Sequence, residues 1–180
     1  MELFLPYPVG GIFASSSAKV NLLRGLSDSA IQHIQERVQA VKQEGDIVIV
    51  SIHWGGNWGY HILQEQIDFA HQLIDEAGVD IIHGHSSHHV KGIEICRDRL
   101  VLYGCGDFLN DYEGIGGYEY YRCDLGLMCF ARMDPSTGKL VQLQMVPSQI
   151  KNFKVNRPSR EDALWLANIL DREGKSLERE

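Results

Sequence analysis

Two apolar runs flanking an amphipathic segment constrain the fold of this chain most. Residues 46–52 read DIVIVSI and residues 79–82 read VDII, and both runs are rich in β-branched side chains. Runs of this kind are typical of strands buried on both faces, as in parallel sheets. Between them, apolar side chains recur at helical spacing over residues 62–77, and Gly78 follows as a stop signal. The sequence therefore predicts a strand–helix–strand unit with two adjacent, parallel strands.

The remaining chain is expected to alternate between further helices and short strands. Ser27 is placed to cap a helix that runs toward Gly45, with its apolar side chains at positions 31, 34, 38 and 41. Further strands are predicted at residues 92–96, 100–103, 125–133 and 140–146. A last helix is predicted over residues 160–172, with Ala163, Leu164, Ala167 and Leu170 on its apolar face. Residues 1–26 are expected to be irregular and residues 173–180 to be frayed.

Composition and charge exclude several classes of protein. The chain has 180 residues, enough for one domain with its own core, and a net charge of −7 without a basic run, which argues against a nucleic-acid partner. No apolar run reaches the roughly 20 residues of a membrane span, and the N-terminus lacks the pattern of a signal peptide, so we expect a cytoplasmic protein. The four cysteines show no paired spacing and are expected to be free thiols: Cys96, Cys105, Cys123 and Cys129.

Four of the eight histidines lie within residues 83–89, directly after the second apolar run. Imidazole is the commonest metal ligand and the usual proton carrier near neutral pH. This density favours a functional site, although an exposed polar loop that is merely rich in histidine remains the alternative. His61 and His71 are expected to be surface or hydrogen-bonded side chains, and His33 has no predicted role.

Three loops are predicted to meet at the carboxyl ends of the strands: residues 51–59, 83–89 and 103–112. His53, His85 and His88 could share a metal ion there. Asp107 or Asp111 could add an oxygen ligand or orient a histidine, and the alternative for Asp107 is a turn cap. Trp54 and Trp58 are expected to be wall or packing residues.

The same loops resemble the CapA (poly-γ-glutamate capsule synthesis) family, which is similar to calcineurin-like metallophosphoesterases. The matching motifs are SIHWG at 51–55, GHSSH at 84–88 followed by GIE at 92–94, and LYGCGDF at 102–108. The chain departs from the family pattern where His-Pro-His becomes Ser86-Ser87-His88 and where the asparagine of Gly-Asn-Phe becomes Asp107. Only His53 and His88 therefore carry over from the family motifs.

The resemblance covers residues 40–150 and implies an α/β fold, a metallophosphoesterase-like β-sandwich flanked by helices, in a single domain over residues 1–180. The family's N-terminal Gly-Asp, Asn-Leu-Glu and Asn-Asn-His motifs are absent from residues 1–45. We therefore expect the C-terminal half of the family's domain, with an N-terminal half or a second copy as partner. An apolar sheet face should then be exposed, and the isolated chain should have negligible phosphodiesterase activity.

The resemblance also implies a divalent metal (manganese, zinc or iron) that activates water for hydrolysis of a small molecule or a polymer such as poly-γ-glutamate. The expected metal ligands are His53, His85, His88 and Asp107, and His83 or His89 is the expected general acid. Trp58 and Tyr60 are expected to shape the pocket mouth. Two alternatives remain open: a non-catalytic accessory module of polymer synthesis or export, and a mononuclear zinc hydrolase that uses the three histidines.

Overall fold

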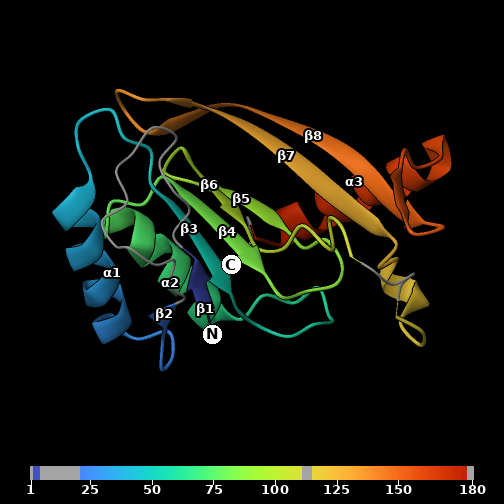
Figure 1. Ribbon diagram of the computed structural model, residues 1–180, viewed down its shortest axis with the longest axis horizontal. Helices are drawn as coiled ribbons and strands as arrows, with labels where there is room; N and C mark the ends of the chain where they lie inside the picture. Colours follow the sequence, from blue (N-terminus) through green and yellow to red (C-terminus); the bar gives the residue numbers. More distant parts are fainter. Residues whose placement is uncertain (1, 5–20, 111–114, 178–180) are drawn as a thin grey trace.

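A computed structural model describes residues 2–4, 21–110 and 115–177 as three helices and two sheets (Figure 1). The helices are α1 (Asp28–Val41), α2 (Gln64–Asp75) and α3 (Arg160–Leu177), with a short 3-10 turn, η1 (Glu119–Tyr121). Six strands form the first sheet in the order β2-β1-β3-β4-β6-β5, and three form the second in the order β7-β8-β9. Their bounds are β1 Glu2–Phe4, β2 Asn21–Leu22, β3 Ile49–His53, β4 Ile81–His85, β5 Ile93–Cys96, β6 Arg99–Leu102, β7 Leu125–Asp134, β8 Lys139–Lys151 and β9 Lys154–Asn156.

The predicted strand–helix–strand unit is confirmed. Strands β3 and β4 are neighbours and run parallel, with Ile49 opposite Ile81 and His53 opposite His85. Strand β6 continues the parallel arrangement beside β4, whereas the edge strand β5 pairs with β6 in the antiparallel direction. Because the first three of these strands end at the same edge, the loops that follow them are brought together there.

Helices α1 and α2 cover one face of the six-stranded sheet. Their buried side chains, including Ile34 and Leu73, join Val50, Ile52 and Ile82 in one apolar cluster. Ser27 occupies the predicted N-cap position of α1, but its hydroxyl bonds that of Ser29 and not a helix amide.

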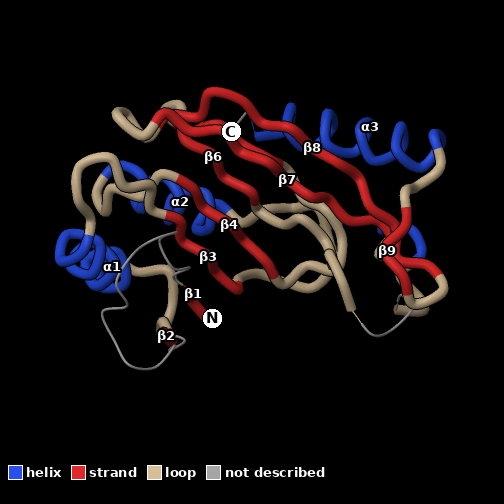
Figure 2. The backbone as a smooth tube through the Cα atoms, turned by 45° about the horizontal axis from the view of Figure 1, so that its top comes forward, coloured by secondary structure: helices blue, strands red, loops and turns tan. Residues whose placement is uncertain are grey.

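The second sheet packs against the opposite face of the first. Leu100 and Leu102 of β6 contact a group of apolar side chains that includes Met133 of β7 and Leu143 of β8. Figure 2 shows β7 and β8 crossing above β6, so the first sheet lies between a helical layer and a second sheet. This arrangement agrees with the predicted α/β sandwich flanked by helices.

Helix α3 differs from its prediction in length and in orientation. It continues to Leu177, so residues 173–177 are helical and not frayed. Its buried side chains are Leu166 and Ile169, which pack against the start of β7, whereas Leu164 of the predicted apolar face is 54% exposed. Leu170 of the predicted face packs against the same cluster, so the buried face is shifted toward Leu166 and Ile169 and away from Leu164.

Three strand predictions also need correction. Residues 2–4 are not irregular, because they pair with β3 in the antiparallel direction as β1. Strand β4 does not end at Ile82 but includes His83 and His85, and β8 continues to Lys151. Within the described residues, both faces of the first sheet are covered, so neither is the exposed apolar face that was predicted. Exposed apolar side chains lie instead on the hairpin of β7 and β8, and they include Phe130, Val141 and Met145.

Candidate functional site

His53 and His85 lie side by side at the carboxyl edge of the first sheet. The register of β3 and β4 places them opposite each other, and their ring centroids are 5.2 Å apart with the planes at 74°. His83 projects from the same face of β4 as His85, since the two are separated by one residue, and their ring centroids are 5.8 Å apart. Its Nδ1 shares a hydrogen bond of 3.0 Å with the Ser51 hydroxyl, and burial lowers the pKa of His83 below its ordinary value.

His88 forms a pair with Asp107. Its Nδ1 donates to the two carboxylate oxygens, at 2.9 Å and 3.2 Å, and Asn110 donates to the same carboxylate at 3.2 Å. The His88 amide also donates to the Asn57 carbonyl at 3.1 Å, which ties the second loop to the first. A carboxylate on Nδ1 fixes the orientation of the His88 ring. The described contacts of Asp107 thus include one of its predicted uses, the orientation of a histidine.

His89 lies next in sequence but in a different environment. It is fully buried, its Nδ1 donates to the Val90 carbonyl at 2.8 Å, and its ring stacks on Tyr121 at 4.7 Å. Burial lowers the pKa of His89 to about 4, so the imidazole is neutral at pH 7. A buried neutral ring without access to solvent does not suit a general acid, and we assign His89 a packing role.

An aromatic cluster forms one wall beside the His88–Asp107 pair. Trp58 stacks face to face on Tyr118 at 4.0 Å and lies 5.4 Å from the His88 ring. Tyr60 packs edge-on against His89 at 4.9 Å, and the Arg172 guanidinium sits 4.8 Å above the Tyr60 ring. Burial raises the pKa of Tyr60 to about 12, so its hydroxyl stays protonated. Trp58 therefore lies beside the site as predicted, whereas Tyr60 belongs to the packed interior of the wall.

Close packing between the loops explains several motif residues. The Trp54 indole stacks on Tyr103 with centroids 5.7 Å apart, and the Ser86 hydroxyl donates to the Trp54 carbonyl. Ser86 adopts a φ of 135°, a backbone conformation that is rare outside glycine. Gly84 passes so near Trp54 that a β-carbon there would overlap the indole. The three loops are thus held in one arrangement by backbone and aromatic contacts.

The donor set fits a metal ion in part. His53 and His85 are adjacent imidazoles at a solvent-facing edge, which suits two nitrogen ligands. Within residues 2–4, 21–110 and 115–177, however, the predicted set of His53, His85, His88 and Asp107 does not form a group of three ligand atoms within 4.8 Å. Asp111 lies outside the described residues. The four-residue ligand set therefore stays a prediction. The fold brings its members together as two pairs, His53 with His85 and His88 with Asp107.

Comparison with known proteins matches residues 12–112, more than half of the chain, to the family of the bacterial capsule synthesis protein PGA_cap. The chain belongs to this family. A probable polyglutamine synthesis accessory protein of Mycobacterium tuberculosis is 49% identical over 139 residues, which are 77% of this chain and 36% of that protein. The PGA biosynthesis protein CapA of Bacillus subtilis is 34% identical over 74 residues, 41% of this chain and 19% of the relative. The capsule biosynthesis protein CapA of Bacillus anthracis is 29% identical over 84 residues, 47% of this chain and 20% of the relative.

The resemblance to the CapA family that was inferred from the three loop motifs is thus confirmed. The chain spans about a third of the length of the M. tuberculosis relative and about a fifth of the two CapA proteins. Among the helices of the described part of the chain, none is both long and apolar enough to cross a membrane.

Sequence reasoning missed the role of Glu94, the acidic residue of the GIE motif. Its carboxylate accepts hydrogen bonds from Tyr103, at 2.8 Å, and from Nε2 of His71, at 2.7 Å. The prediction that His71 has a hydrogen-bonding partner is correct. The alternation of β5 could have shown that Glu94 and Cys96 share one face, but only the packing of α2 shows that His71 meets them.

Proposed function

We propose that this chain is part of a capsule-polymer synthesis protein of the CapA type, with poly-γ-glutamate as the polymer, and that the edge of β3 and β4 binds a divalent metal for hydrolysis. The observation that supports this most is the pairing of His53 and His85, 5.2 Å apart on adjacent parallel strands. His53 belongs to a motif that carries over from the family, and His85 lies on the neighbouring strand in the loop that departs from the family pattern. The names of the family and of the relatives support the class of polymer.

Each residue of the edge has a distinct part in this proposal. His53 and His85 hold the metal ion, and a divalent cation bound there would supply the Lewis acidity that lowers the pKa of water. His88 is oriented by the contact of its Nδ1 with Asp107, and its Nε2 donates a proton to the leaving group. Trp58 and Tyr118 form an aromatic wall that orients the substrate and limits water on that side.

Metal binding and turnover test the proposal together. Isothermal titration calorimetry of the purified chain should show binding of Mn²⁺ or Zn²⁺. The affinity for the ion should fall at least tenfold in His53→Ala and in His85→Ala. His61→Ala is the matched control, because His61 is an exposed histidine of the same region that lies outside the pair. Hydrolysis of an aryl phosphodiester or of poly-γ-glutamate is expected only once the partner half is supplied, and it should then require the same two histidines. Equal affinity in all three variants would contradict the metal site.

A non-catalytic accessory role is the second candidate. The M. tuberculosis relative is named an accessory protein, and no carboxylate joins His53 and His85 in a compact ligand group within the described residues. Two-metal hydrolytic centres generally need carboxylates to balance the cations. Metal binding without turnover, together with polymer synthesis that His85→Ala supports as well as wild type, would favour this role. The mononuclear zinc hydrolase would be favoured by a wild-type protein that binds one zinc ion and shows turnover. Each of His53→Ala, His85→Ala and His88→Ala should then lose the zinc ion.

A further inference from the structure

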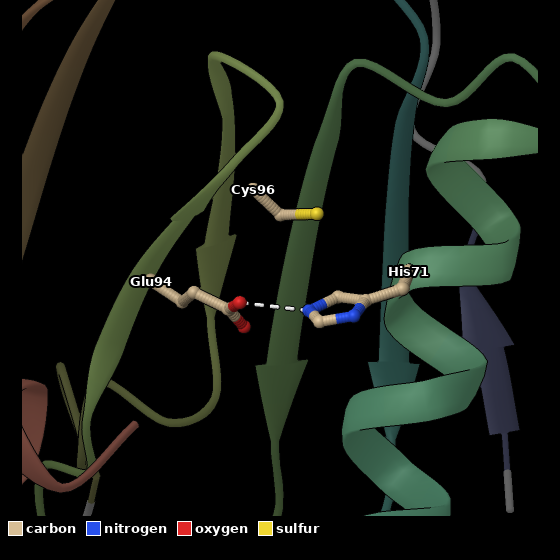
Figure 3. A group of neighbouring side chains, drawn as sticks. All are labelled: His71, Glu94 and Cys96. Atoms are coloured by element: carbon tan, nitrogen blue, oxygen red, sulfur yellow. Dashed lines mark hydrogen bonds and ion pairs between the residues drawn. The ribbon is translucent and has the colours of Figure 1, made fainter. Parts of the chain in front are cut away.

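A second group of metal-binding side chains lies between α2 and the edge strand β5, away from the carboxyl ends of β3 and β4 (Figure 3). It consists of His71, Glu94 and Cys96, and one ligand atom from each lies within 4.8 Å of the others. Figure 3 shows the Cys96 thiol and the Glu94 carboxylate pointing from the strand toward the His71 ring on the helix. Nε2 of His71 and Oε1 of Glu94 are 2.7 Å apart.

The secondary structure makes this arrangement rigid. Glu94 and Cys96 are two residues apart in β5 and therefore project from the same face of the strand. Helix α2 lies on the same side of the sheet, and its His71 reaches toward the two side chains. The hydroxyl of Tyr103 donates to the second carboxylate oxygen of Glu94 at 2.8 Å, and Tyr103 is itself buried against Trp54. A second hydrogen bond of this kind is how proteins fix the orientation of a metal-binding carboxylate.

The donor atoms identify the class of ion. One imidazole nitrogen, one carboxylate oxygen and one sulfur suit Zn²⁺ or Co²⁺, whereas Mg²⁺ and Ca²⁺ prefer oxygen alone. The side chains of His71 and Glu94 are 37% and 18% exposed, so an ion can reach them and water can supply a fourth ligand. Three protein ligands with one open position are the usual composition of a reactive zinc site.

We infer that His71, Glu94 and Cys96 bind one zinc-class divalent ion between α2 and β5. The ion would replace the hydrogen bond between His71 and Glu94 with one bond to each of them, about 2.0–2.2 Å long, and a bond of about 2.3 Å to the Cys96 sulfur. The Cys96 thiol and Nε2 of His71 would release their protons to water as the ion binds. The ion thereby links the helix to the edge strand. The competing arrangement is a metal-free ion pair of His71 and Glu94 with a bystander thiol.

Cobalt absorption distinguishes these two arrangements, because only a bound thiolate gives a sulfur-to-cobalt charge-transfer band. Titration of the reduced full chain with Co²⁺ should produce this band with one equivalent, and Zn²⁺ should displace it. Cys96→Ser should abolish the band, whereas Cys129→Ser should keep it and so controls for the loss of a thiol. His85→Ala should also keep the band, which separates this site from the pair of His53 and His85.

Thermal unfolding supplies a second measurement that does not depend on the thiolate. In the His85→Ala background, which removes the other proposed site, Zn²⁺ should raise the Tm with or without Cys129→Ser, and the shift should be lost when Cys96→Ser or His71→Gln is added. Circular dichroism without metal should show that both variants are folded, and if His71→Gln is not, Cys96→Ser decides alone. A wild-type chain without the band, or a band that survives Cys96→Ser, would overturn the inference.

Discussion

Histidines that are neighbours in residues 83–89 have different roles because the backbone changes direction between them. His83 and His85 still belong to β4, so they share a face and meet Ser51 and His53 of β3. The unusual φ of Ser86 then ends the strand and redirects the chain. Beyond it, His88 turns to Asp107 while His89 turns into the aromatic interior. A cluster that looks uniform in the sequence is thus divided among three environments.

Burial of His89 should make the stability of the chain depend on pH. In the folded chain its pKa is lowered to about 4, whereas the unfolded value is about 6.5. Below pH 6.5 the His89 imidazole therefore takes up a proton in the unfolded chain, whereas in the folded chain it does so only near pH 4. The stabilisation is fully present above pH 6.5 and is lost as the pH falls toward 4. We expect the free energy of unfolding, measured with urea, to fall over this window.

His89→Phe should make that dependence shallower, because a phenyl ring fits the aromatic cluster and does not titrate. His83, whose pKa is also lowered by burial, contributes the same sign in both proteins and leaves a residual slope. Identical slopes for wild type and His89→Phe between pH 4 and 6.5 would show that the His89 ring takes up its proton in the folded chain as readily as in the unfolded one.

At the level of elements, strand β4 is packed tightly at Gly84, where Trp54 and Tyr103 leave no room for a side chain. Gly84 lies within the strand, and a β-carbon there would overlap the Trp54 indole and approach the Tyr103 carbonyl at 2.8 Å. Trp54 follows β3 and Tyr103 follows β6, so the glycine sits where the ends of three neighbouring strands meet. The glycine of the GHSSH motif thus has a packing reason that is independent of chemistry.

Gly84→Ala should lower the free energy of unfolding by about 1–3 kcal/mol, the usual cost of overpacking a filled interior. Gly116→Ala is the matched control, since a β-carbon at Gly116 meets nothing within 4 Å and its φ is not one that disfavours alanine. Urea unfolding followed by tryptophan fluorescence measures both. Equal stability of the two variants would mean that Trp54 can move aside without loss.

For the molecule as a whole, one buried carboxylate connects the layers. Asp80, only 2% exposed, accepts from Lys42 after α1 at 2.8 Å, from the Val48 amide before β3 at 2.9 Å and pairs with Arg99 of β6 at 3.2 Å. Arg99 in turn donates to the Thr137 carbonyl in the turn between β7 and β8 at 2.5 Å. Asp80 therefore links the helical layer, the first sheet and the second sheet.

Asp80→Ala should destabilise the chain by about 3–5 kcal/mol, because it leaves Arg99 and Lys42 without their buried partner. Asp171→Ala removes an exposed ion pair with Lys175 on α3 and should cost about 0.5 kcal/mol or less. Comparison of the two urea midpoints tests the difference. A loss for Asp80→Ala as small as that for Asp171→Ala would show that the layers hold together without this network.

The sequence by itself determined the parallel pair of β3 and β4, the helices around it and membership of the PGA_cap family. Periodicity and β-branched runs are local properties, and they report burial because side-chain direction follows from the backbone alone. The sequence also indicated that His53 and His85 lie at one edge of the sheet, because the carboxyl ends of neighbouring parallel strands lie at the same edge.

Only the tertiary structure decided which side chains meet across long separations. His71 reaches Glu94, and His88 reaches Asp107, through the packing of a helix on an edge strand and the path of a loop. The orientation of α3 likewise depended on which of its side chains filled the space beside β7. Such contacts depend on the register and packing of elements distant in sequence, and no local pattern of residues encodes them.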